Sequence, residues 1–339
     1  MKLKKDIIMI NKNTQTMKAI VSTKYGSPDV LQFQEVAKPE PGDDEILVKI
    51  HATSVTRAHT MMRTGYPLIG RLVIGLTKPK NQIPGTDLAG VIESIGKNIS
   101  DLQVGDEVFG STDVNMGCYA EYVKVKKDDI LIRKPKKMTF AEATAILDGS
   151  TTALPFLQSI AKVKKGQKIL INGASGGIGT AAVQLAKFFG AHVTGVCGPS
   201  NQEMVKALGA DEVIDYTKED FTKSDATYDI IFDTVGKQSF KKCKPVLSVE
   251  GIYISPVLNV GLLMDMLFTS IFGKKKAMFA ATGMLKTEEK LENIGFISSL
   301  INQEKLKVII DRTFRLEDTA DAHRYVDQGH KKGNVVVVM

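Results

Sequence analysis

Apolar and polar residues alternate in short runs through residues 17 to about 135. Gly, Pro and Asp separate these runs, as in "MKAIVSTKYG", "LAGVIESIG" and "YAEYVKVKKDDILIRKP". A period of two residues predicts strands that bury one side and expose the other. Many such strands at close spacing predict a small barrel or sandwich in this part of the chain.

The pattern changes near residue 139. Thr139 and Glu142 have the spacing of a capping box, which predicts a helix over the following segment, "FAEATAI". Beyond it, strand-like and helical segments follow in the order KILING, TAAVQLAKFFG, HVTGVC, NQEMVKALG, EVIDY, DIIFDTVG, GIYISPV and KAMFAATG. Strands that are apolar throughout and separated by helices predict a parallel sheet covered on both faces.

Residues 287–339 follow neither pattern. They predict, in turn, a helix, a strand, a capped helix and a terminal strand, over TEEKLENIGFISSLINQ, KVIIDRTF, LEDTADAHRYVDQ and NVVVVM. His323 falls in the second of these helices. We expect that helix to lie at the surface and His323 to have a structural role.

Composition narrows the class of protein. A chain of 339 residues predicts two domains. Its net charge of +7 comes from scattered lysines and arginines, so no nucleic-acid partner is expected. Its three cysteines are far apart in the sequence, which predicts no disulfide framework and a reducing, cytoplasmic location. None of them has metal-ligand spacing, so no zinc is expected.

Two segments need separate interpretation. Residues 1–16 have a basic start and an apolar stretch too short for a signal peptide, so they predict a flexible extension. Residues 261–273, "GLLMDMLFTSIFG", are apolar but contain Asp265 and are too short to span a bilayer. We expect a buried or interface helix there and no membrane partner.

A glycine-rich loop lies between the first strand and the first helix of the alternating region. It consists of Gly173, Ala174, Ser175, Gly176, Gly177, Ile178 and Gly179. Glycines let main chain approach a phosphate, and the following helix N-terminus attracts the anion. No Gly-Lys-Ser/Thr ending follows, which disfavours an ATP loop. The strand–loop–helix–strand context favours dinucleotide binding over a bare turn.

The second strand of this region ends without an acidic residue. Val196 to Asn201 occupy the place where a carboxylate would bind the 2′-hydroxyl of NAD. The residues there favour NADPH over NADH, with Ser200 and Asn201 as ligands of the 2′-phosphate. Ser200 and Glu203 also have capping-box spacing, so Ser200 has a structural alternative. Tyr216 is expected beside the adenosine or simply packed.

With these residues laid out, residues 17–339 resemble the medium-chain dehydrogenase/reductase family, in particular its zinc-free quinone oxidoreductase (zeta-crystallin) branch. The resemblance rests on the order and spacing of PGTDLAGVIESIG, VGDEVFG, GCYAEYV, GSTTA, INGASGGIGTAAVQLAK, LGADEVIDY, YDIIFDTVG and HKKGNVVVVM. It implies an α/β fold with a GroES-like, partly open β-barrel domain over residues 17–150 and 286–339. It also implies a Rossmann domain over 151–285, an active site in the cleft between the domains, and a homodimer.

This chain departs from the family pattern in two respects. Zinc-dependent relatives have metal ligands where this chain has Thr56, Gly85-Thr86-Asp87 and Asp148. A threonine hydroxyl is no substitute for a thiolate or imidazole, which argues against zinc. Quinone oxidoreductases usually have an Asn near Thr56 and a Tyr near Met61, and both are absent here.

The resemblance also implies individual site residues. Tyr66 is the expected hydrogen-bond donor to the substrate oxygen, with a packed or exposed tyrosine as the alternative. His59 is a second donor or proton source, or a structural residue of its helix. Thr56 and Arg57 are expected to face the cofactor or merely to start a helix. The remaining cofactor residues are Thr152 beside the nicotinamide, Val235, and, for the carboxamide and ribose, Phe279, Ala281 and Asn334.

These observations together predict an NADPH-dependent, zinc-independent oxidoreductase. The expected reaction is hydride transfer to a small electrophile, either a quinone or an α,β-unsaturated carbonyl. Alternatives are a zinc-free alcohol or aldehyde reductase, or a nucleotide-binding redox sensor or structural protein without turnover. A short-chain dehydrogenase is disfavoured because its Tyr-x-x-x-Lys pair should follow the glycine loop, whereas Tyr122 and Lys126 precede it.

Overall fold

The computed structural model describes residues 15–339 and divides them into two compact units. Unit 1 contains residues up to Lys134 together with Phe314–Asp327 and Val337–Met339. Unit 2 contains Pro135–Thr313 and Gln328–Val336. Most of the expected extension, residues 1–14, lies outside the described residues. Thr16 does not belong to it, because Thr16 begins β1.

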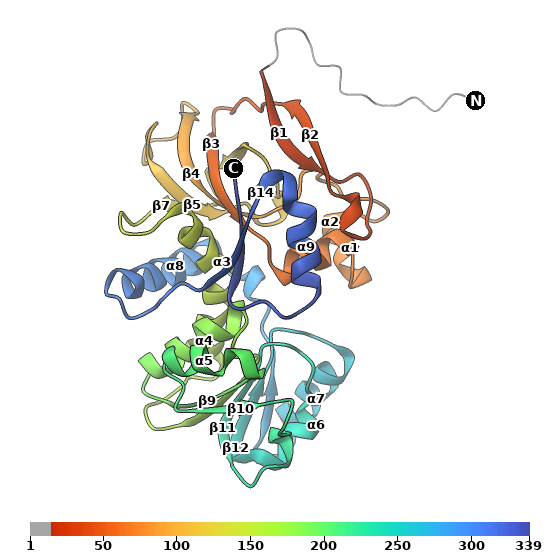
Figure 1. Ribbon diagram of the computed structural model, residues 1–339, viewed down its shortest axis with the longest axis vertical. Helices are drawn as coiled ribbons and strands as arrows, with labels where there is room; N and C mark the ends of the chain where they lie inside the picture. The colour runs from red at the N-terminus through yellow and green to blue at the C-terminus, as the bar shows by residue number, and fades with distance from the viewer. Residues whose placement is uncertain (1–14) are drawn as a thin grey trace, which may run out of the picture. The chain divides into compact units, whose positions relative to one another are not determined.

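Unit 1 is built mainly from antiparallel strands (Figure 1). They are β1 (Thr16–Val21), β2 (Gln32–Ala37), β3 (Glu45–Ser54), β4 (Asp87–Ile95), β5 (Glu107–Ser111), β6 (Tyr122–Lys126) and β7 (Ile130–Arg133). β1 pairs with β2, and the larger sheet has the order β14-β15-β3-β4-β5-β7, with β6 also on β3. β14 (Ile310–Arg315) and β15 (Asn334–Val338) come from the C-terminal part. The strand-rich domain predicted for the first part of the chain is confirmed.

Helices α1 (Arg57–Thr64), α2 (Arg71–Ile74) and α9 (Thr319–Asp327) accompany these strands in the described part of unit 1. The core between the strands consists of alternate side chains, among them Val48, Ile50 and Val108, which are fully or almost fully buried. The period-two pattern therefore reports which side of each strand faces the interior. His323 on α9 is completely buried, so the expectation that it lies at the surface is wrong.

Unit 2 contains the predicted parallel sheet. Its order is β10-β9-β8-β11-β12-β13, formed by Glu212–Asp215, His192–Cys197, Lys168–Asn172, Tyr228–Asp233, Leu247–Ile254 and Lys276–Met278. Helices α4 (Gly177–Phe188) and α5 (Gln202–Ala207) lie on one side of it, and α6 (Phe240–Cys243) and α7 (Val260–Ile271) on the other (Figure 1). The strand order reverses between β8 and β11, which is where doubly wound sheets bind ligands.

Helix α3 (Phe140–Pro155) begins as expected. The Thr139 side chain accepts a hydrogen bond from the Glu142 N–H, and the Glu142 carboxylate accepts one from the Thr139 N–H. The helix packs on α4 so closely that a Cβ at Gly149 would lie 2.3 Å from the Gly177 carbonyl oxygen. This packing places residues 135–150 in unit 2, whereas we expect them in the first domain. α8 (Thr287–Asn302) also belongs to unit 2.

The apolar run over 261–273 forms α7, and this helix is not buried within the chain. Only Leu262 and Thr269 of its residues are buried. Val260 and Ile271 are 79% and 75% exposed. Of the two predicted alternatives, the buried helix is therefore wrong. No helix in the described part of the chain is long and apolar enough to cross a membrane.

Candidate functional site

The predicted cofactor residues gather at one edge of the parallel sheet of unit 2. The glycine loop follows β8, Ser200 and Asn201 follow β9, and Tyr216 follows β10. Val235 follows β11, and Phe279 and Ala281 follow β13. Because the strands are parallel, all these segments lie at their carboxyl ends. Residues far apart in the sequence thus lie along the same edge of the sheet, which includes the place between β8 and β11 where the strand order reverses.

Two glycines of the loop are required by the fold itself. Gly173 has a φ of +81°, and a Cβ there would lie 2.4 Å from Cγ2 of Val235. A Cβ at Gly179 would lie 2.1 Å from the Gly173 carbonyl oxygen. A side chain at Gly179 would push the first turn of α4 away from the loop, and one at Gly173 would be strained by the positive φ and would displace Val235 and Thr234. Neither glycine needs a ligand to explain it.

The other two glycines are not explained in this way. A Cβ at Gly176 would have only the Gly173 carbonyl oxygen within 4 Å, at 3.6 Å. Gly176 has ordinary extended backbone and is the N-cap of α4, where no side chain of the described chain caps the helix. A Cβ at Gly177 would lie 2.8 Å from Oδ1 of Asn334, 2.9 Å from Nζ of Lys331 and 3.5 Å from the Gly333 carbonyl oxygen. The start of α4 therefore has no side-chain cap, which suits close approach of an anion, and Gly333 pairs with Gly176 at the same place.

Lys331 adds a positive charge at this place, which the sequence analysis did not identify. Its Nζ lies 2.9 Å from where a Cβ on Gly177 would be and donates to the Gly333 carbonyl oxygen at 2.6 Å. Burial lowers the pKa of Lys331, while Asp148 and Asp311 act in the opposite direction. The positive charge of an ammonium group then lies beside the partial positive charge of a helix N-terminus, and the two repel each other. A bound anion would relieve that repulsion.

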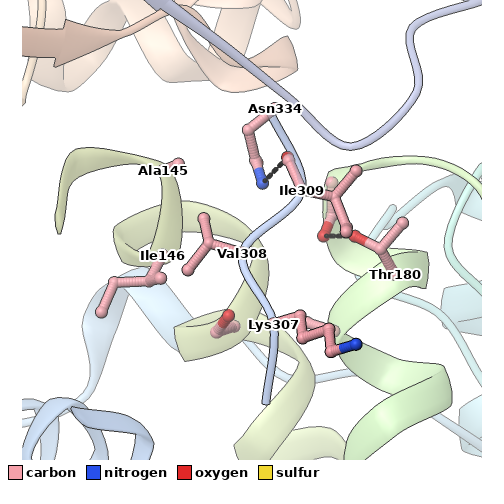
Figure 2. Close-up of a pocket in the computed structure, with 10 residues that line it drawn as sticks. Ala145, Ile146, Thr180, Lys307, Val308, Ile309 and Asn334 are labelled. Atoms are coloured by element: carbon pink, nitrogen blue, oxygen red, sulfur yellow. Dashed lines mark hydrogen bonds between the residues drawn. The ribbon is translucent and has the colours of Figure 1, made fainter. Parts of the chain in front are cut away.

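Asn334 lies on the other side of the Gly177 position. Its main-chain and side-chain N–H groups both donate to the Ile309 carbonyl oxygen, at 2.9 and 3.1 Å. Figure 2 shows the side-chain bond, together with the segment Lys307–Ile309 that passes between α3 and α4. The amide oxygen of Asn334 is then directed at Gly177, 2.8 Å from a Cβ there. Asn334 is held rigidly, and its role toward a ribose or carboxamide stays a prediction.

The loop after β9 has the polar groups expected near an adenosine phosphate. Ser200 does not cap α5, because that helix has no side-chain cap and begins after Asn201, so the structural alternative for Ser200 is wrong. The Asn201 amide donates to Ser175 Oγ at 3.2 Å and thereby ties this loop to the glycine loop. Tyr216 is 56% exposed, and its ring lies 3.6 Å from where a Cβ on Gly198 would be. Tyr216 is therefore not buried, and its ring lies against Gly198 while more than half of the side chain stays exposed.

The other predicted cofactor residues have simpler surroundings. Val235 is 43% exposed and lies against Gly173. Phe279 packs partly into the core of unit 2, and Ala281 is exposed at the end of the same segment. Thr152 is a half-buried residue of α3. Their contacts with a cofactor stay predictions.

In unit 1, His59 belongs to a buried chain of hydrogen bonds. Tyr119 Oη lies 3.2 Å from Nε2 of His323 and 3.0 Å from Nδ1 of His59. Nε2 of His59 lies 2.8 Å from Thr86 Oγ1, which donates to Asp87 at 3.0 Å. The distances fit one direction of donation, from His323 to Tyr119, His59, Thr86 and finally Asp87. With His59 only 4% exposed, its geometry favours the structural alternative.

The other two catalytic candidates differ sharply in exposure. Thr56 is buried and caps α1, since its hydroxyl accepts a hydrogen bond from the His59 N–H at 3.3 Å. The helix-start alternative therefore accounts for Thr56. Arg57 points instead to Asp327, at 3.4 Å. Tyr66 is 69% exposed, just after the α1 C-cap Gly65, so its hydroxyl is accessible to a ligand.

Asp87 gives unit 1 a predictable dependence on pH. Burial raises the pKa of its carboxyl group to about 6, against the opposing hydrogen bonds from Ser54 and Thr86. The folded protein then keeps a proton that the unfolded chain releases between about pH 4 and 6, so the free energy of unfolding falls as pH rises through this window. The Asp87→Asn variant has no carboxyl group at this position and therefore lacks this fall in the free energy of unfolding. We expect its unfolding free energy, relative to wild type, to rise by about 2–3 kcal/mol from pH 4 to pH 7 in urea titrations.

The exposed residue Asp101 provides the control for that measurement. Asp101→Asn should follow the wild-type pH profile throughout. Parallel profiles for Asp87→Asn and wild type would show that Asp87 does not hold its proton in the folded state.

The residues at the family's zinc positions do not fit a zinc ion. The Thr56 hydroxyl is engaged in the cap of α1, and the Asp87 carboxyl is bound by the hydroxyls of Ser54 and Thr86. Within residues 15–339, no three His, Cys, Asp or Glu side chains come together in a way that could hold a metal ion. The expected absence of zinc stays a prediction, which element analysis of the purified protein tests.

Comparison with known proteins supports both units. Residues 42–136 match the alcohol dehydrogenase GroES-like domain, and residues 208–337 match the zinc-binding dehydrogenase family. The chloroplastic quinone-oxidoreductase homolog of Spinacia oleracea is 31% identical and covers 95% of this chain and 98% of its own. The mitochondrial NAD(P)H oxidoreductase RTN4IP1 of Mus musculus is 32% identical, with 95% and 89% covered.

Solved structures agree with this comparison. The quinone oxidoreductase from Coxiella burnetii has a TM-score of 0.85 and 28% identity, and the match covers 96% of this chain and 100% of that one. The two domain types indicate the same family as these relatives. So does the glycine loop at the carboxyl edge of the parallel sheet. The chain belongs to the medium-chain dehydrogenase/reductase family of oxidoreductases, in its quinone oxidoreductase-like group.

Proposed function

We propose that this protein uses NADPH to reduce a quinone or an α,β-unsaturated carbonyl compound, without a metal ion. The observation that carries the proposal is the uncapped start of α4 at Gly176 and Gly177, with the Lys331 ammonium beside it. The fold leaves space for a side chain at Gly176, whereas a Cβ at Gly177 would displace the side chains of Asn334 and Lys331. A dinucleotide pyrophosphate would satisfy the helix N–H groups and Lys331 at once.

NADPH supplies a hydride, and this chain supplies its binding site. Main-chain N–H groups of the first turn of α4 and Lys331 hold the pyrophosphate. Ser200 and Asn201 lie where a 2′-phosphate is expected, and residues 198–202 after β9 contain no carboxylate to repel it. The exposed ring of Tyr216 offers its face to the adenine. These contacts favour NADPH over NADH.

Tyr66 is the proposed donor to the substrate oxygen, because its hydroxyl is the accessible one among the predicted catalytic groups. Tyr66→Phe should lower kcat about tenfold while leaving the Kd for NADPH unchanged, since one hydrogen bond contributes roughly 1–2 kcal/mol. Stopped-flow turnover and fluorescence titration measure the two quantities. Complete loss of turnover with normal NADPH affinity would mean that Tyr66 does more than stabilise the transition state by one hydrogen bond.

The direct test of the proposal is NADPH consumption against a panel of quinones, 2-alkenals and saturated aldehydes. Reduction of quinones or 2-alkenals supports it, whereas reduction of saturated aldehydes alone would identify an aldehyde reductase. NADPH binding with no turnover on any member would favour a nucleotide sensor. A relative of this chain carries the name quinone-oxidoreductase homolog, which places quinones first in the panel.

We also propose a reducing, cytoplasmic setting and a homodimer. Cys118, Cys197 and Cys243 are all buried and unpaired, and burial raises the pKa of each thiol. Thiols of this kind react slowly and do not form cross-links. Sedimentation equilibrium would test the homodimer.

A further inference from the structure

Asp233 is a completely buried acidic residue at the carboxyl end of β11, and the predicted site residues do not include it. Its side chain lies between the end of β8 and the loop that follows β11. Oδ1 of Asp233 accepts a hydrogen bond from the side-chain amide of Asn172, the last residue of β8, at 2.8 Å. An acidic side chain is rarely buried to this degree unless its surroundings hold it in place.

The loop after β11 is folded around this carboxylate. Oδ1 also accepts hydrogen bonds from the main-chain N–H groups of Val235 and Gly236, at 3.2 and 3.1 Å. Oδ2 accepts one from the N–H of Gln238 at 2.9 Å. Because loop N–H groups have no neighbouring strand to bind, an acceptor that they share fixes the path of the loop. Val235 is thereby held against Gly173 of the glycine loop.

Tyr253 of β12 holds the same carboxylate from the other side. Its hydroxyl donates to Oδ2 of Asp233 at 3.0 Å and lies 3.2 Å from the Gln238 carbonyl oxygen. Burial and the neighbouring Asp233 carboxylate raise the pKa of Tyr253, so the hydroxyl keeps its proton and acts as a donor. Side chains from three adjacent strands, β8, β11 and β12, therefore meet at Asp233.

The loop after β11 lies on the side of β8 where the second half of a dinucleotide is expected. The proposed adenosine contacts, Ser200, Asn201 and Tyr216, follow β9 and β10, on one side of β8. A dinucleotide that crosses the sheet edge at the glycine loop extends past β8 to the other side, over β11 and β12. The nicotinamide half would then lie against the Val235 loop that Asp233 holds.

We propose that Asp233 is a positioning residue for the nicotinamide half of the nucleotide. Its carboxylate keeps residues 234–238 and the end of β8 in the shape that accepts the nicotinamide and its ribose before the nucleotide binds. A loop that is already ordered binds more tightly, because no free energy is spent on ordering it. This inference rests on the proposed use of NADPH, and it assigns to Asp233 no contact with the reacting atoms.

The same strand provides a matched control. Asp229 also belongs to β11, and its carboxylate accepts hydrogen bonds from the Lys168 N–H and the Ser248 hydroxyl, both at 2.9 Å. Lys168 begins β8 and Ser248 belongs to β12, so Asp229 joins the same three strands as Asp233 does. Asp229 lies toward the amino end of β11, away from the glycine loop.

Calorimetric titration of the full-length protein with NADPH and with adenosine 2′,5′-bisphosphate tests the proposal. The second ligand contains the adenosine half alone. For Asp233→Asn, we expect the Kd for NADPH to rise about tenfold or more, while the Kd for the bisphosphate stays within about twofold of wild type. Asp229→Asn should leave both Kd values at the wild-type level. A general loss of stability would not separate the two ligands in this way.

Hydrogen exchange in the nucleotide-free protein measures the order of the loop directly. The amides of Val235, Gly236 and Gln238 should exchange about tenfold faster or more in Asp233→Asn, because their acceptor is replaced by a weaker one. In Asp229→Asn they should exchange at the wild-type rate. Unchanged exchange of these amides in Asp233→Asn would overturn the proposal.

Tyr253→Phe keeps the test decisive if Asp233→Asn folds poorly, because it removes one donor to Asp233 and retains the buried ring. We expect its Kd for NADPH to rise about threefold or more, with the Kd for the bisphosphate unchanged. Wild-type NADPH affinity in whichever of the two variants is folded, or an equal loss for both ligands, would overturn the proposal. Failure of the wild-type protein to bind NADPH would overturn the proposed function itself, so the two failures are distinguishable.

Discussion

Gly177→Asp is expected to raise the Kd for NADPH at least 100-fold while the protein remains folded. The new carboxylate would lie at the first turn of α4, beside Nζ of Lys331, where the pyrophosphate is proposed to bind. The carboxylate would itself interact with the helix N-terminus and the ammonium group in place of the pyrophosphate, and it would repel the phosphates. A 100-fold change corresponds to about 2.7 kcal/mol, which a charge at this position can supply. Fluorescence or calorimetric titration with NADPH measures the change.

Gly177→Asn is the matched control for charge, because it has the size of aspartate and none of its charge. We expect a smaller loss of affinity in this variant. Gly176→Ala provides a purer steric test, since the added methyl group meets only one atom, at 3.6 Å, in the protein itself. Its Tm should stay at the wild-type value while its affinity for NADPH falls. Unchanged affinity in both Gly176→Ala and Gly177→Asp would rule out a pyrophosphate at this loop.

Ser200→Asp is expected to reverse the preference for the two nucleotides. The residue follows β9, at the place where NAD-binding proteins of this fold carry an acid. A carboxylate there repels a 2′-phosphate and accepts hydrogen bonds from free ribose hydroxyls. We expect the ratio of kcat/KM for NADPH to that for NADH to fall about 100-fold or more. Steady-state kinetics with each nucleotide and one common acceptor give this ratio.

Ser200→Asn separates charge from size in the same experiment. It should lower the NADPH preference by only a few fold, because an amide still donates to a phosphate. If Ser200→Asp and Ser200→Asn behave alike, the 2′-phosphate does not contact this residue. The nucleotide preference would then depend on other residues near Asn201 and Tyr216.

His59 in unit 1 shows that sequence alone cannot distinguish a catalytic histidine from a structural one. His59 has the ordinary features of a proton donor in sequence, yet its ring joins Tyr119 to Thr86 in the interior. Burial also lowers the pKa of His323 at the other end of this chain, so that ring stays neutral. These residues form a buried chain of hydrogen bonds that ends at Asp87. Tyr66 remains as the accessible donor.

Much of the architecture could be predicted from local patterns. Alternation with a period of two indicated the strands of unit 1, and β-branched runs between helices indicated the parallel sheet of unit 2. The Thr139–Glu142 capping box is present as predicted. These features are local, since periodicity and capping depend on residues a few positions apart. The glycine loop was recognisable for the same reason, because its strand and helix adjoin it.

The tertiary structure decided which distant residues meet and which sides of helices face solvent. Lys331 reaches Gly177 because the segment before β15 pairs with the loop at Gly176 and Gly333, and no local pattern marks that lysine. His323 is buried because α9 packs over Tyr119. The α7 sequence indicates an apolar helix, whereas the packing of unit 2 decides which side of it the core leaves free. Sequence periodicity records local burial, but the path of the chain determines long-range neighbours.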